Sequence, residues 1–492
     1  MPLDPRTPVL VASGQVNQRG DTDPVEPVEL MAAAAREAAG ARVLAAVESI
    51  RVVNVFSWRY RDPGRPLARL IGARDAATSY SGVGGNMPQS LVNQACLDIQ
   101  HGRVDVVLIA GAETWRTRMR LRAQGTRPDW PRQDETVPLA PGASADVPMV
   151  GPAEERIGLG RPANVYPMFE QALRIASGEP CDDHRRRIGE LWSRFSAVAE
   201  DNPNAWSRKA LSAEQIWRPA PDNRMISWPY TKLLNSNNMV DQAAVVILAS
   251  VRAANRFKIP SERWVFPYTG TDAHDTYAIG ERAELHASPA IRIAGTRALE
   301  LAGLAVDDVE LIDVYSCFPS AVQVAAIELG LPVGDRDRPL TVTGGLTFAG
   351  GPWNNYVTHA IGTMAQRLVE QPGSRGLITA NGGYLTKHSF GVYGTEPPAG
   401  EFRWEDVQSL VDREPTRAAV VEWDGVGTVE AWTAPFDRNG RAEKAFLAVR
   451  TPEDHRTLAV ITDPTEAETT VVEDIAGIKV RVHPDGTAAL RD

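Results

Sequence analysis

Short apolar runs of strand length alternate with longer helical segments over roughly the first 395 residues. Residues 9–13 form an apolar run typical of a buried strand, and residues 50–56 form another. Between them, residues 27–40 have the spacing of a helix, because Pro27 suits a first helical turn and Gly40 suits a helix end. This strand–helix–strand order predicts a layered α/β domain.

The same order of elements returns about 260 residues later in the chain. A helix is predicted over residues 288–302 and a strand over 309–315. In each half a Gly-Gly pair then opens a helix that leads into a strand: Gly84-Gly85 before a helix to about 101 and a strand over 104–111, and Gly350-Gly351 before a helix to about 370 and a strand over 376–380. We interpret this pattern as an internal duplication, in which two similar α/β halves share one interface.

Two further regions lie outside the two similar halves: one is inserted between them and the other follows them. The first is a less regular insertion between the halves, and insertions of this length in an α/β scaffold usually carry function, because loops carry binding groups. The last ~90 residues show short alternating runs and an Asn439-Gly440 turn, which predict a small all-β barrel or sandwich. We therefore expect four regions: a first half (1–115 with 241–275), an inserted loop domain (116–240), a second half (276–395) and a β domain (401–492).

Composition narrows the class of protein. A chain of 492 residues is too long for one compact core and suggests two to four domains. No apolar run reaches ~18 residues, so we expect no membrane span, and the N-terminus lacks the features of a secretory signal. Cys96, Cys181 and Cys317 have neither disulfide nor metal-ligand spacing. We therefore expect no metal site and a cytoplasmic location.

The negative charge is concentrated in the last domain. Residues 401–492 carry 11 Lys and Arg against 19 Asp and Glu, whereas the preceding 400 residues carry 41 against 43. An acidic domain is a poor partner for a polyanion, so nucleic-acid binding is disfavoured. A role for this domain as a protein-partner, lid or acyl-binding module is favoured instead.

Four motifs in the right order carry a family resemblance. Residues 102–113 resemble the thiolase segment G-x-x-D-V-V-L-A-G-G-x-E, and residues 343–352 resemble the thiolase block N-x-x-G-G-x-x-x-x-G-H-P. Residues 240–245 look like the D-G-A-A-A strand entry of the superfamily. Residues 315–318 are similar to the H-D-C-F motif of the sterol-carrier-protein-type (SCP2-thiolase-like) branch.

This resemblance covers about residues 8–395 and implies a duplicated thiolase fold of layered αβαβα type. It also implies a likeness to acetyl-CoA acetyltransferases, with a coenzyme A (CoA) thioester as ligand or substrate and no separate cofactor. The tail resembles the small OB-like barrels found with thiolase relatives. Such relatives are commonly dimers, but the extra domain could block the shared edge, so both a dimer and a monomer remain open.

The residues that a standard thiolase uses are replaced at three aligned positions. By the resemblance, the nucleophilic cysteine corresponds to Gly85, the histidine of the G-H-P motif to Gly351, and the second cysteine to Ala380. Loss of one member of a catalytic unit can reduce kcat on the order of 10⁶-fold. We therefore expect no ordinary thiolysis or Claisen condensation.

Other residues are candidates for remaining chemistry. By the resemblance, Cys317 aligns with the acid/base cysteine of the sterol-carrier branch, and Tyr315 stands where the motif has an asparagine or histidine. Because Cys317 is predicted to follow a strand instead of opening a helix, nothing evident makes it a thiolate. His388 follows the Gly382-Gly383 turn and is a candidate base, while Asn381 could donate to a thioester oxygen.

Ligand binding is expected at glycines and arginines. Gly85 and Gly351 would present backbone N–H groups at helix N-termini, which suit an anion or a carbonyl oxygen, and Asn354 follows closely. Arginines could hold the phosphates of CoA because guanidinium binds phosphate bidentately. The candidates are Arg116, Arg118, Arg120 and Arg122, with Arg185, Arg186 and Arg187 as an alternative.

Three functional hypotheses follow from these residues. The first is a thiolase-like protein that binds acyl-CoA and lacks standard acyltransferase activity. The second is an active acyl-CoA transferase or a retro-aldol lyase of lipid or sterol metabolism that uses Cys317, Tyr315 and His388. The third is a pure interaction protein. Ligand binding separates the first two from the third, and turnover separates the first from the second.

Overall fold

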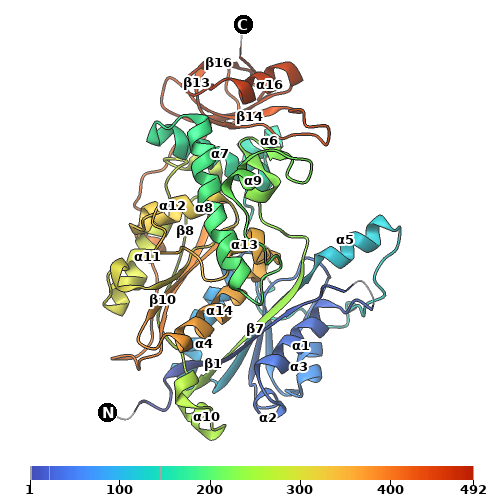
Figure 1. Ribbon diagram of the computed structural model, residues 1–492, viewed down its shortest axis with the longest axis vertical. Helices are drawn as coiled ribbons and strands as arrows, with labels where there is room; N and C mark the ends of the chain where they lie inside the picture. Colours follow the sequence, from blue (N-terminus) through green and yellow to red (C-terminus); the bar gives the residue numbers. More distant parts are fainter. Residues whose placement is uncertain (1–2, 21–22, 144–146, 491–492) are drawn as a thin grey trace.

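The computed structural model describes residues 3–20, 23–143 and 147–490; the ends of the expected first and last domains and part of the insertion lie outside these ranges. Along the long axis of the molecule, the last domain lies at one end and the first sheet at the other (Figure 1). The helices are α1 (Pro27–Ala38), α2 (Ala41–Leu44), α3 (Gly64–Ile71), α4 (Met87–Gln100), α5 (Trp115–Ala123), α6 (Pro152–Ile157), α7 (Pro162–Ser177), α8 (Cys181–Asp201), α9 (Ala213–Trp217), α10 (Val251–Arg256), α11 (Pro289–Ala302), α12 (Pro319–Leu329), α13 (Gly345–Phe348), α14 (Tyr356–Glu370), α15 (Gln408–Val411) and α16 (Pro464–Val472).

Two five-stranded mixed sheets form the body of the protein. The first has the order β1-β7-β4-β2-β3 and the second the order β12-β8-β11-β10-β9. The strands of the first are β1 (Pro8–Asn17), β2 (Ser49–Val52), β3 (Ala77–Tyr80), β4 (Val106–Thr114) and β7 (Asp241–Ser250). Those of the second are β8 (Phe266–His274), β9 (Leu311–Asp313), β10 (Arg375–Gly382), β11 (Lys387–Gly394) and β12 (Arg403–Asp406).

The two sheets repeat one pattern of strand directions. In the first, β1 and β7 are antiparallel, β7 and β4 are antiparallel, and β4 and β2 are parallel. In the second, β8 and β11, β11 and β10, and β10 and β9 follow the same sequence of directions. The predicted α/β fold with an internal duplication is thus confirmed.

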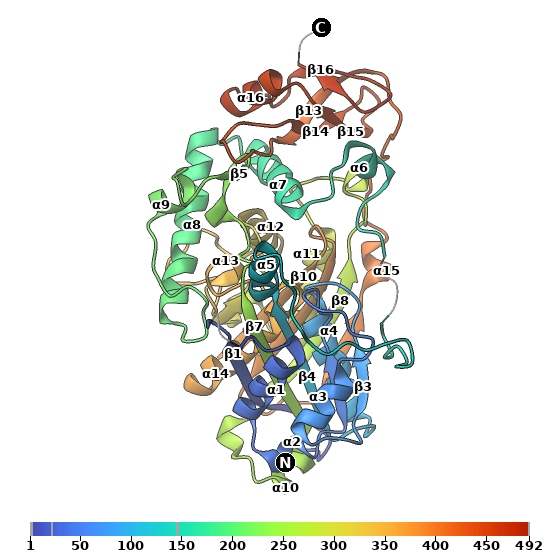
Figure 2. The same ribbon diagram turned by 90° about the vertical axis from the view of Figure 1, so that its right-hand side faces the viewer.

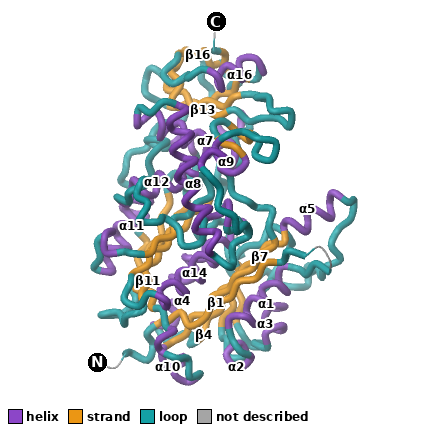
Figure 3. The backbone as a smooth tube through the Cα atoms, viewed as in Figure 1, coloured by secondary structure: helices purple, strands orange, loops and turns teal. Residues whose placement is uncertain are grey.

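The two helices predicted to follow the Gly-Gly pairs lie between the sheets. Helix α4 packs on β11, β8 and β7, and α14 packs on β7, β1 and β10, so each contacts both sheets. Helices α1 and α3 pack with the first sheet and α11 with the second, which completes a layered αβαβα arrangement (Figures 1 and 3). Helix α1 approaches β1 so closely that a Cβ at Gly14 would lie 2.1 Å from the carbonyl oxygen of Ala34.

Two strands fall outside the regions expected for them. Strand β8 joins the second sheet, although residues 241–275 are expected in the first half. Strand β12 also joins the second sheet, where it runs parallel to β8, although it lies in the range expected for the β domain. The apolar pattern of a strand indicates which of its faces is buried, but not which sheet it extends.

Helices α6 and α7 of the insertion lie next to the last domain, whereas α5 lies beside the first sheet (Figure 1). The insertion contains α5 to α9 and a small pair of strands, β5 (Met225–Ser227) and β6 (Tyr230–Thr231). The last domain is an antiparallel half-barrel with the order β15-β14-β13-β16-β17, and β13 packs on α7 (Figure 2). Its strands are β13 (Gly425–Thr433), β14 (Ala445–Arg450), β15 (Arg456–Ile461), β16 (Lys479–Val482) and β17 (Ala488–Ala489).

Membrane spans and metal clusters are two features that can be assessed over the described ranges. There, no helix has both the length and the apolar composition needed to cross a membrane. Within the same ranges, no group of three or more His, Cys, Asp or Glu side chains is arranged to hold a metal ion.

Candidate active site

Five of the predicted site residues meet where the second sheet approaches the start of α4. Tyr315 and Cys317 lie in the segment between β9 and α12, which leaves the sheet earlier than the predicted strand over 309–315. Asn381 lies near the end of β10 and faces His388 on β11 in the ladder between these strands. Gly85 lies just before α4 and contacts this group from the first half.

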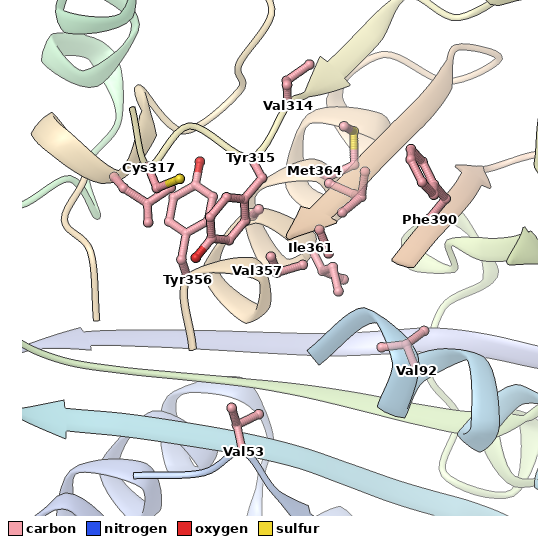
Figure 4. Close-up of a cluster of buried hydrophobic side chains, with 14 of the residues drawn as sticks. Val53, Val92, Val314, Tyr315, Cys317, Tyr356, Val357, Ile361, Met364 and Phe390 are labelled. Atoms are coloured by element: carbon pink, nitrogen blue, oxygen red, sulfur yellow. The ribbon is translucent and has the colours of Figure 1, made fainter. Parts of the chain in front are cut away.

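The phenol of Tyr315 fills the space where a side chain at position 85 would lie. A Cβ built on Gly85 would lie 2.3 Å from the hydroxyl oxygen of Tyr315 and 2.5 Å from the backbone oxygen of Asn381. The Tyr315 backbone N–H donates to Thr379 Oγ1 at 2.9 Å, and its ring packs edge-on against Tyr356 at 5.5 Å. Figure 4 shows the two rings together beside Cys317.

Cys317 is buried, and it lies closer to a helix than expected. It follows β9 and comes two residues before Pro319, the first residue of α12. Burial nevertheless raises the pKa of its thiol to about 12, although polar contacts with Tyr166, the local backbone and Asn381 lower it in part. Cys317 is therefore a thiol at neutral pH.

Tyr166 of α7 joins these groups, a role that no motif in the sequence indicated. Its hydroxyl donates to the carbonyl oxygen of Gly383 at 2.9 Å and accepts from Asn381 Nδ2 at 3.0 Å and from the Leu385 N–H at 3.1 Å. Its ring stacks on Phe318 with centroids 4.4 Å apart. Tyr166 is thus one of the groups through which the insertion holds the candidate site.

The side-chain oxygen of Asn381 has no hydrogen-bond partner among the described residues. Because its Nδ2 donates to Tyr166 and lies 3.8 Å from Cys317 Sγ, its Oδ1 points away from both and has no hydrogen-bond partner within the described residues. A small cavity borders Asn381, Tyr315 and His388, with room for about one water molecule. A water, or a ligand group that donates a hydrogen bond, would satisfy Asn381 Oδ1.

The imidazole of His388 lies beside the buried carboxylate of Asp275. Its Nε2 lies 3.1 Å from the carbonyl oxygen of Leu385 and 3.5 Å from Asp275 Oδ2. Burial by itself would raise the pKa of Asp275, but Arg282, His388 and Ser288 together hold it below its usual value. Asp275 is therefore ionised at neutral pH and fixes the orientation of His388.

The second glycine pair is built differently from the first. The Gly351 N–H donates to the carbonyl oxygen of Asn237 at 2.9 Å, so it is not available to a ligand as expected, and α14 begins only at Tyr356. Asn354 joins the halves instead: its Oδ1 accepts from the Gly84 N–H at 3.0 Å, and its Nδ2 donates to the carbonyl oxygen of Asn54 at 3.0 Å.

The arginines of α5 lie on two faces of one helix. Residues two apart on a helix are rotated by roughly 200°, so Arg116 and Arg120 share one face and Arg118 and Arg122 the other. Arg116 lies 3.9 Å from Asp241 Oδ2, whereas Arg118 donates to the carbonyl oxygen of Phe56 at 2.9 Å.

An aromatic group connects α5 to the Gly351 segment. Arg118 lies over the ring of Trp115, 5.3 Å from its centroid. The ring of Trp353 packs edge-on against both Trp115 and Phe56, at 5.2 and 5.3 Å. The rings of Trp115 and Trp353 thus connect Arg118 to the segment that contains Asn354, and Asn354 bonds Gly84.

The alternative arginine cluster is occupied by contacts within the protein. Arg187 pairs with Glu179 at 2.9 Å, and Arg186 pairs with Asp183 at 2.8 Å. Arg185 lies over the rings of Trp217 and Trp228. These contacts favour a structural role for the three side chains.

Comparison with known proteins identifies the family. A family model described as the additional C-terminal domain of thiolase-like protein type 1 matches residues 406–487. The crystal structure of a monomeric SCP2-thiolase like protein type 1 from Mycobacterium smegmatis superimposes with a TM-score of 0.84 and 30% identity, covering 99% of this chain and 100% of that one. This chain belongs to the SCP2-thiolase-like proteins of type 1.

More distant relatives agree with this assignment. Acetyl-CoA acetyltransferases from Methanothermobacter thermautotrophicus and Syntrophomonas wolfei are 26% identical over 168 residues and 29% identical over 145. The matches span 31% and 30% of this chain. They cover 42% and 34% of the length of those enzymes, which is less than half of either one. The resemblance to the thiolase superfamily drawn from the sequence motifs is thereby confirmed for this type 1 protein.

Two further solved structures share the fold alone. The Ltp2-ChsH2(DUF35) aldolase has a TM-score of 0.59 at 19% identity, covering 80% of this chain and 98% of that one. The dimeric peroxisomal thiolase of Saccharomyces cerevisiae has a TM-score of 0.57 at 15% identity, covering 80% and 99%.

Proposed function

We propose that this type 1 protein binds CoA or acyl-CoA and does not form a covalent acyl-enzyme. The observation that carries the proposal is the position of Tyr315, whose hydroxyl lies 2.3 Å from where a Cβ at Gly85 would be. The helix N-terminus at α4 therefore lacks a nucleophile and also lacks space for one. Cys317 offers no substitute, because burial keeps it a thiol.

The proposed path for CoA follows the aromatic group beside α5. Arginine side chains of α5 would hold the phosphates, and the rings of Trp115 and Trp353 would flank the chain that leads to the thioester. The thioester end would then lie near Asn354 and the Gly84-Gly85 pair, since Asn354 already bonds the Gly84 N–H. Asn381 and Tyr315 would bound the acyl end of this path.

Calorimetry combined with intact-mass spectrometry tests the proposal. We expect heat of binding for CoA and for acetyl-CoA, and an unmodified chain after incubation with acetyl-CoA or acetoacetyl-CoA. Absence of binding to either ligand would leave the interaction-protein hypothesis. A stable acetyl adduct on Cys317, absent from Cys317→Ala, would contradict the non-covalent proposal.

A second candidate function is retro-aldol cleavage or acyl transfer at the same cluster. It is favoured by the convergence of Tyr315, His388 and Asn381 on one small cavity. In a retro-aldol step a base takes the hydroxyl proton of a 3-hydroxyacyl thioester, the carbon–carbon bond breaks to release an aldehyde or ketone, and the acyl-CoA carbanion takes up a proton. Asn381 Oδ1, which has no partner among the described residues, could accept a hydrogen bond from that hydroxyl.

Product analysis separates this candidate from simple binding. Incubation with 3-hydroxyacyl-CoA thioesters, followed by carbonyl trapping and mass spectrometry, would reveal an aldehyde or ketone if cleavage occurs. Cleavage that persists in His388→Gln and in Tyr315→Phe would exclude the assigned residues, whereas no cleavage in the native protein would leave the binding role alone.

A further inference from the structure

The last domain holds one segment of the body through a fully buried arginine. Arg456, the first residue of β15, forms a two-point ion pair with Glu430 of β13, at 2.7 and 2.8 Å. Its remaining N–H groups donate to the carbonyl oxygens of Gly280, Arg282 and Ala283, at 3.1 Å for Gly280 and 3.3 Å for Ala283. Since an arginine side chain only donates hydrogen bonds, this ring of oxygens satisfies it.

Neighbouring arginines of the same domain hold the same segment. Arg417 donates to the carbonyl oxygen of Ala283 at 3.0 Å and pairs with Glu284 at 3.1 Å. Arg450 pairs with Glu284 and Glu430, at 3.1 and 3.0 Å. The segment 280–284 is therefore fixed by contacts with the last domain.

From this segment Arg282 reaches into the candidate site. Its Nη2 donates to the carbonyl oxygen of Tyr384 at 3.0 Å and also to that of Leu385, and its Nη1 lies 3.6 Å from Asp275 Oδ2. The side chain is buried and lies over the ring of Phe169. Arg282 thus bonds both the loop that precedes His388 and the carboxylate that orients His388.

The loop that Arg282 bonds is one that needs support. Leu385 has a φ of +53°, a left-handed conformation that costs free energy for a residue other than glycine. Its N–H donates to Tyr166 and its carbonyl oxygen accepts from Arg282, so the turn is fixed from both sides. Asn381 and His388 lie at the two ends of this loop.

We propose that the last domain is a built-in positioning module for the candidate site. It acts through two positioning residues: Arg456 fixes the backbone of the segment 280–284, and Arg282 in that segment fixes the loop 382–388. The coupling follows a continuous series of charged hydrogen bonds from β13 and β15 to Leu385, and an ion pair joins Arg282 to Asp275. The function of this domain is then to hold the site in shape, and its acidic outer surface is not required for it.

Hydrogen–deuterium exchange on the full chain tests this proposal without any ligand. In Arg456→Lys the positive charge beside Glu430 remains, but a single ammonium group cannot reach the carboxylate and three carbonyl oxygens together. We expect amide exchange in peptides covering 280–284 and 382–388 to become roughly tenfold faster or more. Exchange in β1 and β7 should stay at the native rate and report that the body is folded.

Arg174→Lys is the matched control. Arg174 of α7 also forms a two-point ion pair with the last domain, here from the insertion, with Asp474 at 2.8 and 2.9 Å, but it does not contact the segment 280–284. This variant should leave exchange in 382–388 unchanged. Unchanged protection of 382–388 in Arg456→Lys, or equal loss of protection in both variants, would overturn the proposal.

Arg282→Gln provides a second test, because it changes the other positioning residue, which belongs to the second half of the body. It should release 382–388 while leaving the last domain folded, which its own peptides report. If 382–388 keeps its native exchange rate in this variant, Arg282 is not the connecting residue. Because these readouts need no ligand, the result is independent of whether the proposed CoA binding is found.

Discussion

Single residues decide what the candidate site can do, and Tyr315 with Gly85 is the decisive pair. Gly85 allows the Tyr315 hydroxyl to approach the start of α4, and Tyr315 in turn leaves no room for a side chain there. In a close-packed interior an added methyl group forces neighbouring side chains to move. The two positions therefore have to change together.

A pair of substitutions tests this dependence. We expect Gly85→Ala to lower the free energy of unfolding by about 1–3 kcal/mol, because its Cβ overlaps the Tyr315 hydroxyl. Adding Tyr315→Ala should relieve the overlap with the phenol, although the contact with the backbone oxygen of Asn381 remains, and it removes the packing of the ring. The two changes should therefore be non-additive in denaturant unfolding. Gly400→Ala, where no atom lies within 4 Å of the new Cβ, is the control. Strict additivity would show that the two positions do not interact.

The acidity of Cys317 gives a prediction on pH. Since burial raises its pKa to about 12, the thiolate fraction should rise about tenfold for each pH unit up to at least pH 10. Alkylation by iodoacetamide, followed on the Cys317 peptide by mass spectrometry, should rise in the same way without levelling off. In chain unfolded by urea the rate should level off above about pH 9. A plateau near pH 8 in the folded protein would reveal an activated thiolate.

At the scale of elements, the repeated glycine and strand pattern was enough to predict the two halves and the helices between them. The pattern could not place β8 and β12, because it indicates burial of a strand and not the sheet that the strand extends. It also missed Tyr166, whose hydroxyl bonds Asn381 from 215 residues away in the chain. Such a contact leaves no local periodicity. The sequence brought Cys317, Tyr315, Asn381, His388 and Gly85 forward as separate candidates, and only the fold shows that they meet.

Helix α5 carries a prediction that depends on its two faces. Arg118 and Arg122 are on the more exposed face, whereas Arg116 faces Asp241. If the exposed face holds the CoA phosphates, Arg118→Ala with Arg122→Ala should weaken binding by about 1–3 kcal/mol for each charged hydrogen bond removed, measured by calorimetry. Arg186→Ala, which removes an exposed arginine already paired with Asp183, should leave the affinity unchanged. Equal affinities in native and doubly substituted protein would remove α5 from the proposed site.

At the scale of the whole molecule, the oligomeric state depends on whether the edge strands of the sheets are covered. Strand β3 is one of the two terminal strands of the first sheet, and an uncovered edge of this kind invites pairing with a second chain. Here a turn of the insertion covers the end of β3 at Tyr80. The Tyr80 N–H donates to the carbonyl oxygen of Pro141 at 2.9 Å, and the Ala140 N–H donates to that of Arg61 at 2.9 Å. The solved relatives include both a monomeric type 1 protein and a dimeric thiolase.

We predict from this covered edge that the protein is a monomer at micromolar concentration, measured by size-exclusion chromatography with light scattering. Replacing residues 139–142 by a Gly-Ser linker of equal length removes the carbonyl of Pro141 from its fixed position and exposes the β3 edge. This variant should associate in a concentration-dependent way, because the Tyr80 N–H would then be able to donate to a strand of another chain. Its far-ultraviolet circular dichroism should match the native protein and exclude unfolding as the cause. A native dimer would show that pairing uses a surface other than β3, and a linker variant that stays monomeric would show that residues 139–142 are not what prevents association.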